Sequence, residues 1–228
     1  MKKKKITQDK VVYFINYVLL ALLLVIVLYP IIYIISCSFS SGSALMAGRV
    51  RLLPVEFTFD SYKAVFKYQS IWSGYKNSVI YTIVGTLISI VFTLFAAYPL
   101  SRDDFRGQKL FTGLFLFTMM FSGGLIPTYL LVRNLKLIDT MWAIVLPGAV
   151  SAYNMIVART FFKQTIPKEL MEAAEMDGCS DFKFFSRIVI PLSTPIVAVL
   201  CLWVAVSLWN SYFNPMIYIN SEDKYPLQ

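Results

Sequence analysis

Five long apolar stretches constrain what this chain can fold into. Each has enough residues to cross the hydrocarbon core of a bilayer as a helix, which takes roughly 20 apolar residues. Asp, Glu, Lys and Arg are absent from all five, except for Arg159 near the end of the fourth. We therefore predict an all-α fold, a polytopic transmembrane helical bundle. The stretches are Val11–Ser36, Asn77–Leu100, Leu110–Val132, Met141–Phe162 and Ile188–Asn210.

The composition agrees with a membrane protein. Charged residues make up 15% of the 228 residues, whereas soluble domains carry about 25%. The net charge of +8 could suggest nucleic acid, but in a membrane protein surplus Lys and Arg set orientation and contact anionic lipid. We expect membrane lipid, and no nucleic acid, among the partners.

The distribution of basic residues predicts the orientation. Residues 1–10 contain five lysines and are expected in the cytoplasm. Threading the five stretches alternately places 13 basic residues inside and 8 outside. This divides the chain into a cytoplasmic N-terminus (1–10), a first span (11–36), an extracellular segment (37–76) and a transmembrane core (77–228). Since five spans leave the C-terminus outside, we expect a final span that this sequence lacks.

Glycine and proline mark a break point inside the third stretch. It contains Gly123, Gly124 and Pro127, and the backbone bond lost at a proline needs another partner at membrane depth. Together with Gly85 and Gly113, these glycines are also expected to allow close helix contact.

The residues offer no catalytic machinery. The chain has no His and no G-x-x-x-x-G-K-[ST] phosphate loop, and its apolar stretches carry no paired carboxylates. We therefore expect a subunit that is not an enzyme, holds no cofactor or metal, and takes its energy from another subunit. Its three cysteines are too widely spaced to indicate a zinc site or a disulfide framework.

A polar segment, residues 163–187, interrupts the apolar sequence and is expected to be cytoplasmic. Five of the chain's thirteen acidic residues lie between Glu169 and Asp181. Pro167 suits the first turn of a helix, Gly178 can end that helix in the left-handed conformation, and Ser180 or Asp181 can cap a second helix. The segment is therefore predicted to form a helix–glycine–helix hairpin.

Two kinds of contact remain open for this hairpin on physical grounds. Small residues (Ala173, Ala174, Gly178) would let a partner's backbone approach closely, and apolar anchors are supplied by Phe182, Phe184 and Phe185. The alternative is an amphipathic helix that rests on lipid. The acidic excess favours a protein partner, because anionic headgroups repel carboxylates.

The hairpin also resembles a family motif. Glu172-Ala173-Ala174, three residues, Gly178, nine residues and then Ile188-Val189-Ile190-Pro191 is similar to the EAA motif of ABC importer permeases, EAA-x3-G-x9-I-x-L-P. The one departure is Ile190 in place of Leu. Further segments look like maltose-type carbohydrate permeases, especially their LplC- and YtcP-type branch: Phe121–Tyr129, Leu137–Thr140, Leu146–Gly148 and Arg159–Phe162.

This resemblance implies the ABC type I importer permease fold in a bacterial plasma membrane. It also implies three partners: a second homologous permease, an ATPase dimer that binds ATP and Mg²⁺, and an extracellular sugar-binding lipoprotein. The hairpin would dock in a cleft of the ATPase, where Glu172 could meet an arginine. By position, the coupling residues are Glu172, Ala173, Ala174, Asp177 and Gly178.

Candidate sugar contacts follow from residue type. Sugars are held by aromatic faces and by amide or hydroxyl groups in a concave site, which selects Tyr153, Asn154, Trp209, Asn210 and Asn214. For any one of them, an interfacial aromatic or a helix-packing amide is the more common role. The leading function is carbohydrate (oligosaccharide) import. The alternatives are an ABC permease for a non-sugar solute, such as an amino acid or peptide, and a membrane scaffold subunit without transport.

Overall fold

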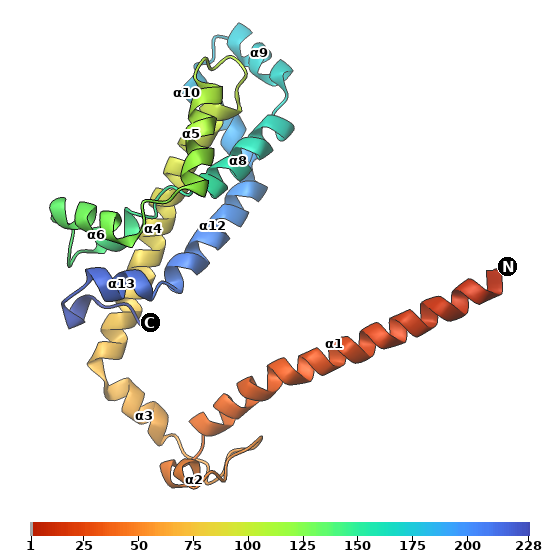
Figure 1. Ribbon diagram of the computed structural model, residues 1–228, viewed down its shortest axis with the longest axis vertical. Helices are drawn as coiled ribbons and strands as arrows, with labels where there is room; N and C mark the ends of the chain where they lie inside the picture. Colours follow the sequence, from red (N-terminus) through yellow and green to blue (C-terminus); the bar gives the residue numbers. More distant parts are fainter. Residues whose placement is uncertain (1) are drawn as a thin grey trace. The chain divides into compact units, whose positions relative to one another are not determined.

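The computed structural model describes the backbone of residues 2–228 and the side chains of residues 10–228. All regular structure in this range is helical, which confirms the predicted all-α class. The chain forms two compact units, residues 1–69 and residues 70–228, and each is described by itself (Figure 1).

The first unit consists of one long helix and a short compact segment. Helix α1 spans Lys2–Ser38, and its part from Lys10 onward is apolar and long enough to cross a membrane. None of the most apolar part of this helix is buried by the rest of the chain. Such a surface needs lipid or another chain to cover it. This helix contains the predicted first span.

The segment after α1 is held by its own polar and aromatic contacts. It contains α2 (Gly42–Met46) and α3 (Asp60–Lys67). The Ser36 hydroxyl donates to the Leu52 carbonyl at 2.7 Å, and the rings of Phe39 and Phe57 stack with centroids 5.4 Å apart.

In the second unit, α4 is a single helix from Gln69 to Ser101, so the second predicted span begins earlier than Asn77. At Gly85, an added Cβ would lie 2.6 Å from Cδ1 of Leu208. Glycine therefore permits the close approach of a later helix, as predicted. Gly113 has no neighbouring atom within 4 Å among the described residues, so close helix contact there stays a prediction.

The third stretch breaks where the glycines and the proline predict. Helix α5 (Gln108–Met120) and helix α6 (Leu125–Asn134) are bent by 113° with respect to each other. Gly124 lies in the break with φ +83°, a conformation that glycine adopts without steric cost.

The fourth stretch corrects a prediction. A continuous span from Met141 to Phe162 is wrong, since α7 (Met141–Val145) and α8 (Ala152–Thr165) are separated by a loop containing Pro147 and Gly148. With 14 residues, α8 is about 21 Å long at 1.5 Å per residue, shorter than the roughly 30 Å hydrocarbon core.

The fifth stretch is also bent. After α10 (Asp181–Phe184), the stretch begins within a π-helix (Phe185–Val189), runs through α11 (Ile190–Leu192) and continues as α12 (Thr194–Trp209). The two parts make an angle of 79°. The described residues thus contain 2 continuous helices long and apolar enough to span, or up to 4 if each bent pair is one span, whereas the sequence predicted five.

The main core of the second unit lies between α4, α8, α12 and the segment around α10. Its most enclosed side chains are at most 1% exposed: Ala97, Met155, Ala158, Phe162, Val189 and Leu200. The single charge in the apolar stretches joins this core to the end of α4, because Nε of Arg159 donates to the Leu100 carbonyl at 2.7 Å. A cation at a helix C-terminus is electrostatically favourable.

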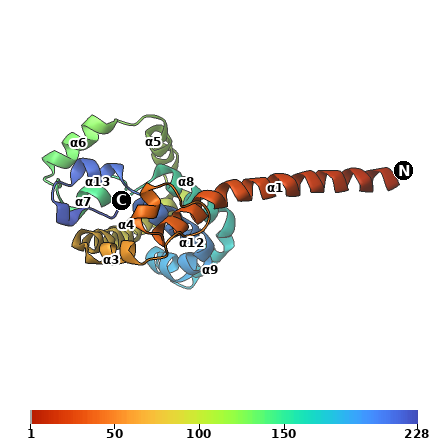
Figure 2. The ribbon, with the colours of Figure 1, turned by 90° about the horizontal axis from the view of Figure 1, so that it is seen from below.

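The two ends of the second unit differ. One end carries α10 and α9 (Lys168–Met176), and the other carries α6 and α13 (Phe213–Tyr218) (Figure 1). At this other end α7 and α13 lie side by side (Figure 2). There the Asp139 carboxylate accepts hydrogen bonds from the Ser221 hydroxyl at 2.7 Å and from Nζ of Lys224 at 2.7 Å.

Candidate functional site

The polar segment forms a hairpin with a glycine at its turn. Helix α9 begins after Pro167, which is its N-cap. At its other end the Gly178 N–H donates to the Glu175 carbonyl at 3.0 Å and the Cys179 N–H donates to the Ala174 carbonyl at 2.9 Å. These two bonds, with φ of +71° at Gly178, form a Schellman motif, which needs a residue in the left-handed conformation at this position.

The two faces of α9 have different surroundings. Met171 and Ala174 pack against the main core, whereas Glu172 and Ala173 are exposed. Among the described residues Glu172 makes no ion pair. Of the five residues predicted to couple to an ATPase, Ala174 is half-buried in its own chain and the other four are exposed: Glu172, Ala173, Asp177 and Gly178.

The hairpin also exposes large apolar side chains. Met176 is 89% exposed and Phe182 is 67% exposed, although Phe182 stacks on Phe95 with centroids 6.4 Å apart. Phe184 and Phe185 are 2% and 6% exposed and anchor the hairpin in the core. The outer surface is thus both acidic and apolar, a combination typical of a surface that another protein covers.

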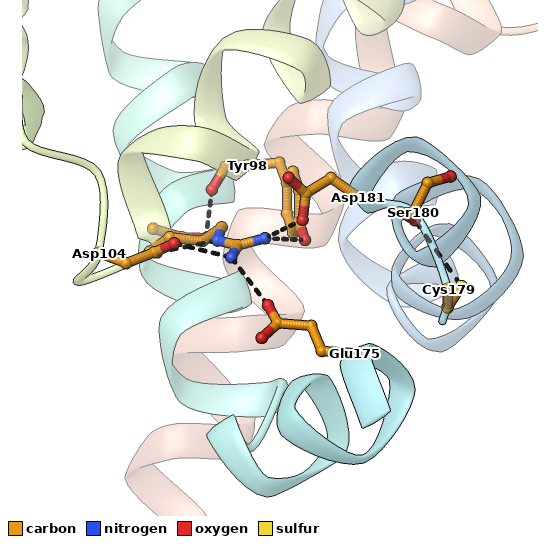
Figure 3. Close-up of polar contacts among 8 residues, drawn as sticks. Tyr98, Asp104, Glu175, Cys179, Ser180 and Asp181 are labelled. Atoms are coloured by element: carbon orange, nitrogen blue, oxygen red, sulfur yellow. Dashed lines mark hydrogen bonds and ion pairs between the residues drawn. The ribbon is translucent and has the colours of Figure 1, made fainter. Parts of the chain in front are cut away.

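An arginine directly after α4 connects that helix to both halves of the hairpin. The Arg102 guanidinium makes a bidentate contact with Asp104, at 2.9 and 2.8 Å. It also donates to Oδ1 of Asp181 at 2.7 Å and to Oε1 of Glu175 at 3.4 Å. Figure 3 shows these carboxylates and the Tyr98 hydroxyl, which accepts at 3.3 Å, converging on one point.

The contact favours the charged forms of Arg102 and Asp104. Hydrogen bonding to Asp104 raises the pKa of Arg102 above its ordinary value, and the guanidinium lowers the pKa of Asp104. The Arg102 side chain is 13% exposed. Sequence reasoning missed this cluster, because Arg102 and Asp181 are 79 positions apart.

Asp103 makes a second contact with the hairpin segment, at the N-terminal end of α9. Its carboxylate pairs with Nζ of Lys163 at 2.9 Å and with Nζ of Lys168 at 2.5 Å. Hydrogen bonds from Lys168, then from Lys163, lower the pKa of Asp103 to about 2. Residues 102–104 therefore hold the hairpin segment both before and after α9.

A polar-lined cavity of about 320 Å³ lies beside α4, closer to the N-terminus of that helix than the Arg102 cluster. The side chains of Asn154 and Asn214 line it together, and neither has a hydrogen-bond partner among the described residues. Trp203 supplies an aromatic face. Hydroxyl groups come from Ser89, Ser151, Ser207 and Ser211.

The other three predicted sugar-contact residues do not line this cavity. Tyr153 is 54% exposed and lies against Trp203, with ring centroids 5.9 Å apart. Trp209 lies against Tyr75 at 6.4 Å. The Asn210 amide donates to the carbonyl one turn earlier in its own helix at 2.7 Å. Their role in sugar contact stays a prediction.

Apolar helices, a polar-lined cavity bordered by α4, α8 and α12, and a polar hairpin at one end are together typical of a membrane permease. The chain belongs to the family described as binding-protein-dependent transport system inner membrane component, whose sequence profile matches residues 70–221. This membership confirms the resemblance and the ABC type I importer permease fold.

Curated relatives and a solved structure agree with this family. Over 203 residues the chain is 42% identical to Protein LplC of Bacillus subtilis (strain 168), covering 89% of this chain and 68% of the relative. Over 212 residues it is 39% identical to the polygalacturonan/rhamnogalacturonan transport system permease protein YtcP of the same organism, covering 93% and 74%. A crystal structure of a bacterial ABC transporter involved in the import of the acidic polysaccharide alginate matches with a TM-score of 0.93 and 40% identity, covering 96% of this chain and 78% of the matched chain.

Proposed function

We propose that this chain is a pore-forming permease subunit of an ATP-driven importer for oligosaccharides in a bacterial plasma membrane. The relative that transports polygalacturonan and rhamnogalacturonan supports a carbohydrate substrate. So does the solved transporter of alginate, which is also an acidic polysaccharide. Among these substrates, acidic oligosaccharides are the first to test.

The observation that carries the coupling part of the proposal is the exposure of the motif residues on a fixed hairpin. Glu172 and Ala173 point away from the core, so an ATPase cleft can reach them without unfolding the permease. Glu172 pairs with an arginine of the ATPase, and Ala173 allows close packing. Ala174 supports the hairpin from inside. ATP and Mg²⁺ are bound by the ATPase dimer and not by this chain.

The orientation and the other partners complete the proposal. The N-terminus and the hairpin face the cytoplasm, as the distribution of basic residues favours. The exposed apolar surface of α1 is covered by lipid and by a second homologous permease. An extracellular sugar-binding lipoprotein delivers the substrate to the opposite side.

The cavity of about 320 Å³ is the proposed substrate path through this subunit. Asn154 and Asn214 line it. Their side-chain amides have no partner among the residues that the structure describes and can exchange hydrogen bonds with sugar hydroxyls, and the Trp203 indole offers a face for a sugar ring. Three other candidates are next to lining residues in the sequence but do not line the cavity themselves: Tyr153, Trp209 and Asn210. They would contact sugar only if the pore rearranges during transport.

Reconstitution of the complete importer tests the function. The two permeases and the ATPase dimer are placed in proteoliposomes with the binding protein, and ATP hydrolysis and uptake are measured with oligogalacturonides, with an amino acid and with a peptide. We expect oligogalacturonide to stimulate both activities. Stimulation by the amino acid or the peptide alone would show a permease for another solute, and hydrolysis without any uptake would favour a scaffold.

A further inference from the structure

The loop between α4 and α5 makes ion pairs with the hairpin through residues that lie outside the family motif. We call Arg102, Asp103 and Asp104 the clamp. Arg102 contacts Glu175 on α9 and Asp181 on α10, which lie on either side of the turn at Gly178. One side chain thereby joins both helices of the hairpin to the end of α4.

Arginine suits this position for a geometric reason. Its planar fork presents five donors in fixed directions, and here they reach three carboxylates and the Tyr98 hydroxyl at the same time. The carboxylates are 54–75% exposed, whereas the Arg102 side chain is 13% exposed. An isolated exposed ion pair contributes little, but several contacts that share one enclosed cation form a network.

The clamp directly follows the helix that lines the proposed substrate path. Gly85 and Ser89 of α4 line the cavity, and Arg102 follows the last residue of that helix. From Ser89 to Ser101, the last residue of α4, is about 18 Å along one continuous helix. Any displacement of the hairpin that the clamp transmits therefore moves one wall of the cavity.

We propose that Arg102 is the positioning residue that transmits movement of the hairpin to α4 and so to the substrate path. This inference rests on the proposed function, because it assumes that an ATPase moves the hairpin. Apolar packing of α9 on the core resists separation but allows sliding, whereas directed contacts to both hairpin helices make the hairpin and α4 move together.

The test compares uptake with ATP hydrolysis in the reconstituted importer. The variants are Arg102→Gln, Arg102→Lys and Asp181→Asn, and the matched control is Arg106→Gln. Arg106 lies in the same loop and makes no ion pair with the described residues. Each complex is quantified for assembly, and uptake per ATP hydrolysed is measured with oligogalacturonide and the loaded binding protein.

We expect Arg102→Gln to lower uptake per ATP about tenfold, within the range typical of coupling between sites, while the assembled complex still hydrolyses ATP. Asp181→Asn should give a defect in the same direction. Arg102→Lys should recover part of the ratio, because it keeps the charge without the fork. Arg106→Gln should match the wild type.

Two results would overturn the proposal. One is an unchanged ratio of uptake to hydrolysis in Arg102→Gln. The other is a loss of assembled complex in Arg102→Gln together with a wild-type ratio in Asp181→Asn and Arg102→Lys, which would leave only a structural role. Failure of the proposed function is distinguishable, because the wild-type importer would then show no uptake driven by ATP.

Discussion

Replacement of the turn glycine by valine is the sharpest test of the hairpin's role. Gly178 has φ of +71°, and an added Cβ would find no atom within 4 Å. The Cβ added by Gly178→Val therefore meets no neighbouring atom, and the main cost is the left-handed backbone conformation, about 1–2 kcal/mol for an L-residue. If the turn relaxes instead, it loses the two Schellman bonds, each worth about 0.5–1.5 kcal/mol.

Either route disfavours the native hairpin by about 1.4 kcal/mol, a tenfold change in an equilibrium constant. We expect uptake per ATP in the reconstituted importer to fall by about that factor, while the complex still assembles. Gly178→Asn should be milder, because asparagine tolerates the left-handed conformation better than valine.

Gly48 provides a matched control. It has φ of +64° and no atom within 4 Å of an added Cβ. The Gly48 N–H donates to the Leu45 carbonyl and the Arg49 N–H to the Ala44 carbonyl, which forms the same Schellman motif at the end of α2. Gly48→Val imposes equal backbone strain away from the hairpin and should leave uptake per ATP unchanged. Wild-type uptake per ATP in Gly178→Val, or an equal loss in Gly48→Val, would refute the reasoning.

Three further predictions concern single side chains. Ala173→Trp should lower uptake per ATP about tenfold and leave the melting temperature unchanged. Ala174→Trp overpacks the core and should lower the melting temperature. An equal fall in melting temperature for the two variants would contradict this. Hydrogen bonds from Lys224 and Ser221 lower the pKa of the Asp139 carboxyl. The contribution of Asp139 to stability is therefore present above about pH 3.9 and is lost as the pH falls through the folded-state pKa. Thermal melting should therefore show Asp139→Asn less stable than the wild type at pH 7, with a difference that shrinks in acid; a difference independent of pH would contradict it. Asn154→Leu should raise the KM for uptake about tenfold by removing one sugar hydrogen bond, and Asn210→Leu, whose amide is bonded within its own helix, should not; equal effects would contradict the cavity's role.

Local features could be predicted from the sequence because their causes lie within a few residues. The bend before Leu125 follows from two glycines and a nearby proline. The turn at Gly178 follows from the helix pattern before it. The same local reasoning failed for Met141–Phe162, because this stretch is apolar enough for a span but contains the Pro147–Gly148 pair, which interrupts the helix.

The candidate sites depended on distant residues and could be predicted only in part. Asn154 and Asn210 are both amides in apolar helices, yet one lines a cavity and the other bonds to its own backbone. Ala173 and Ala174 are neighbours in the motif, yet only Ala174 packs on the core. These differences arise from the rotation of each helix against its neighbours, which no single segment encodes.

The amino-acid sequence by itself determined that this chain is a helical membrane protein with a polar hairpin ended by a glycine. Hydrocarbon length, the need to satisfy backbone hydrogen bonds and the left-handed conformation are properties of consecutive residues. Only the tertiary structure decided that Arg102 holds Glu175 and Asp181, and that α4 joins this contact to a polar cavity. Such contacts form between residues more than 70 positions apart, and they exist only once the helices have packed.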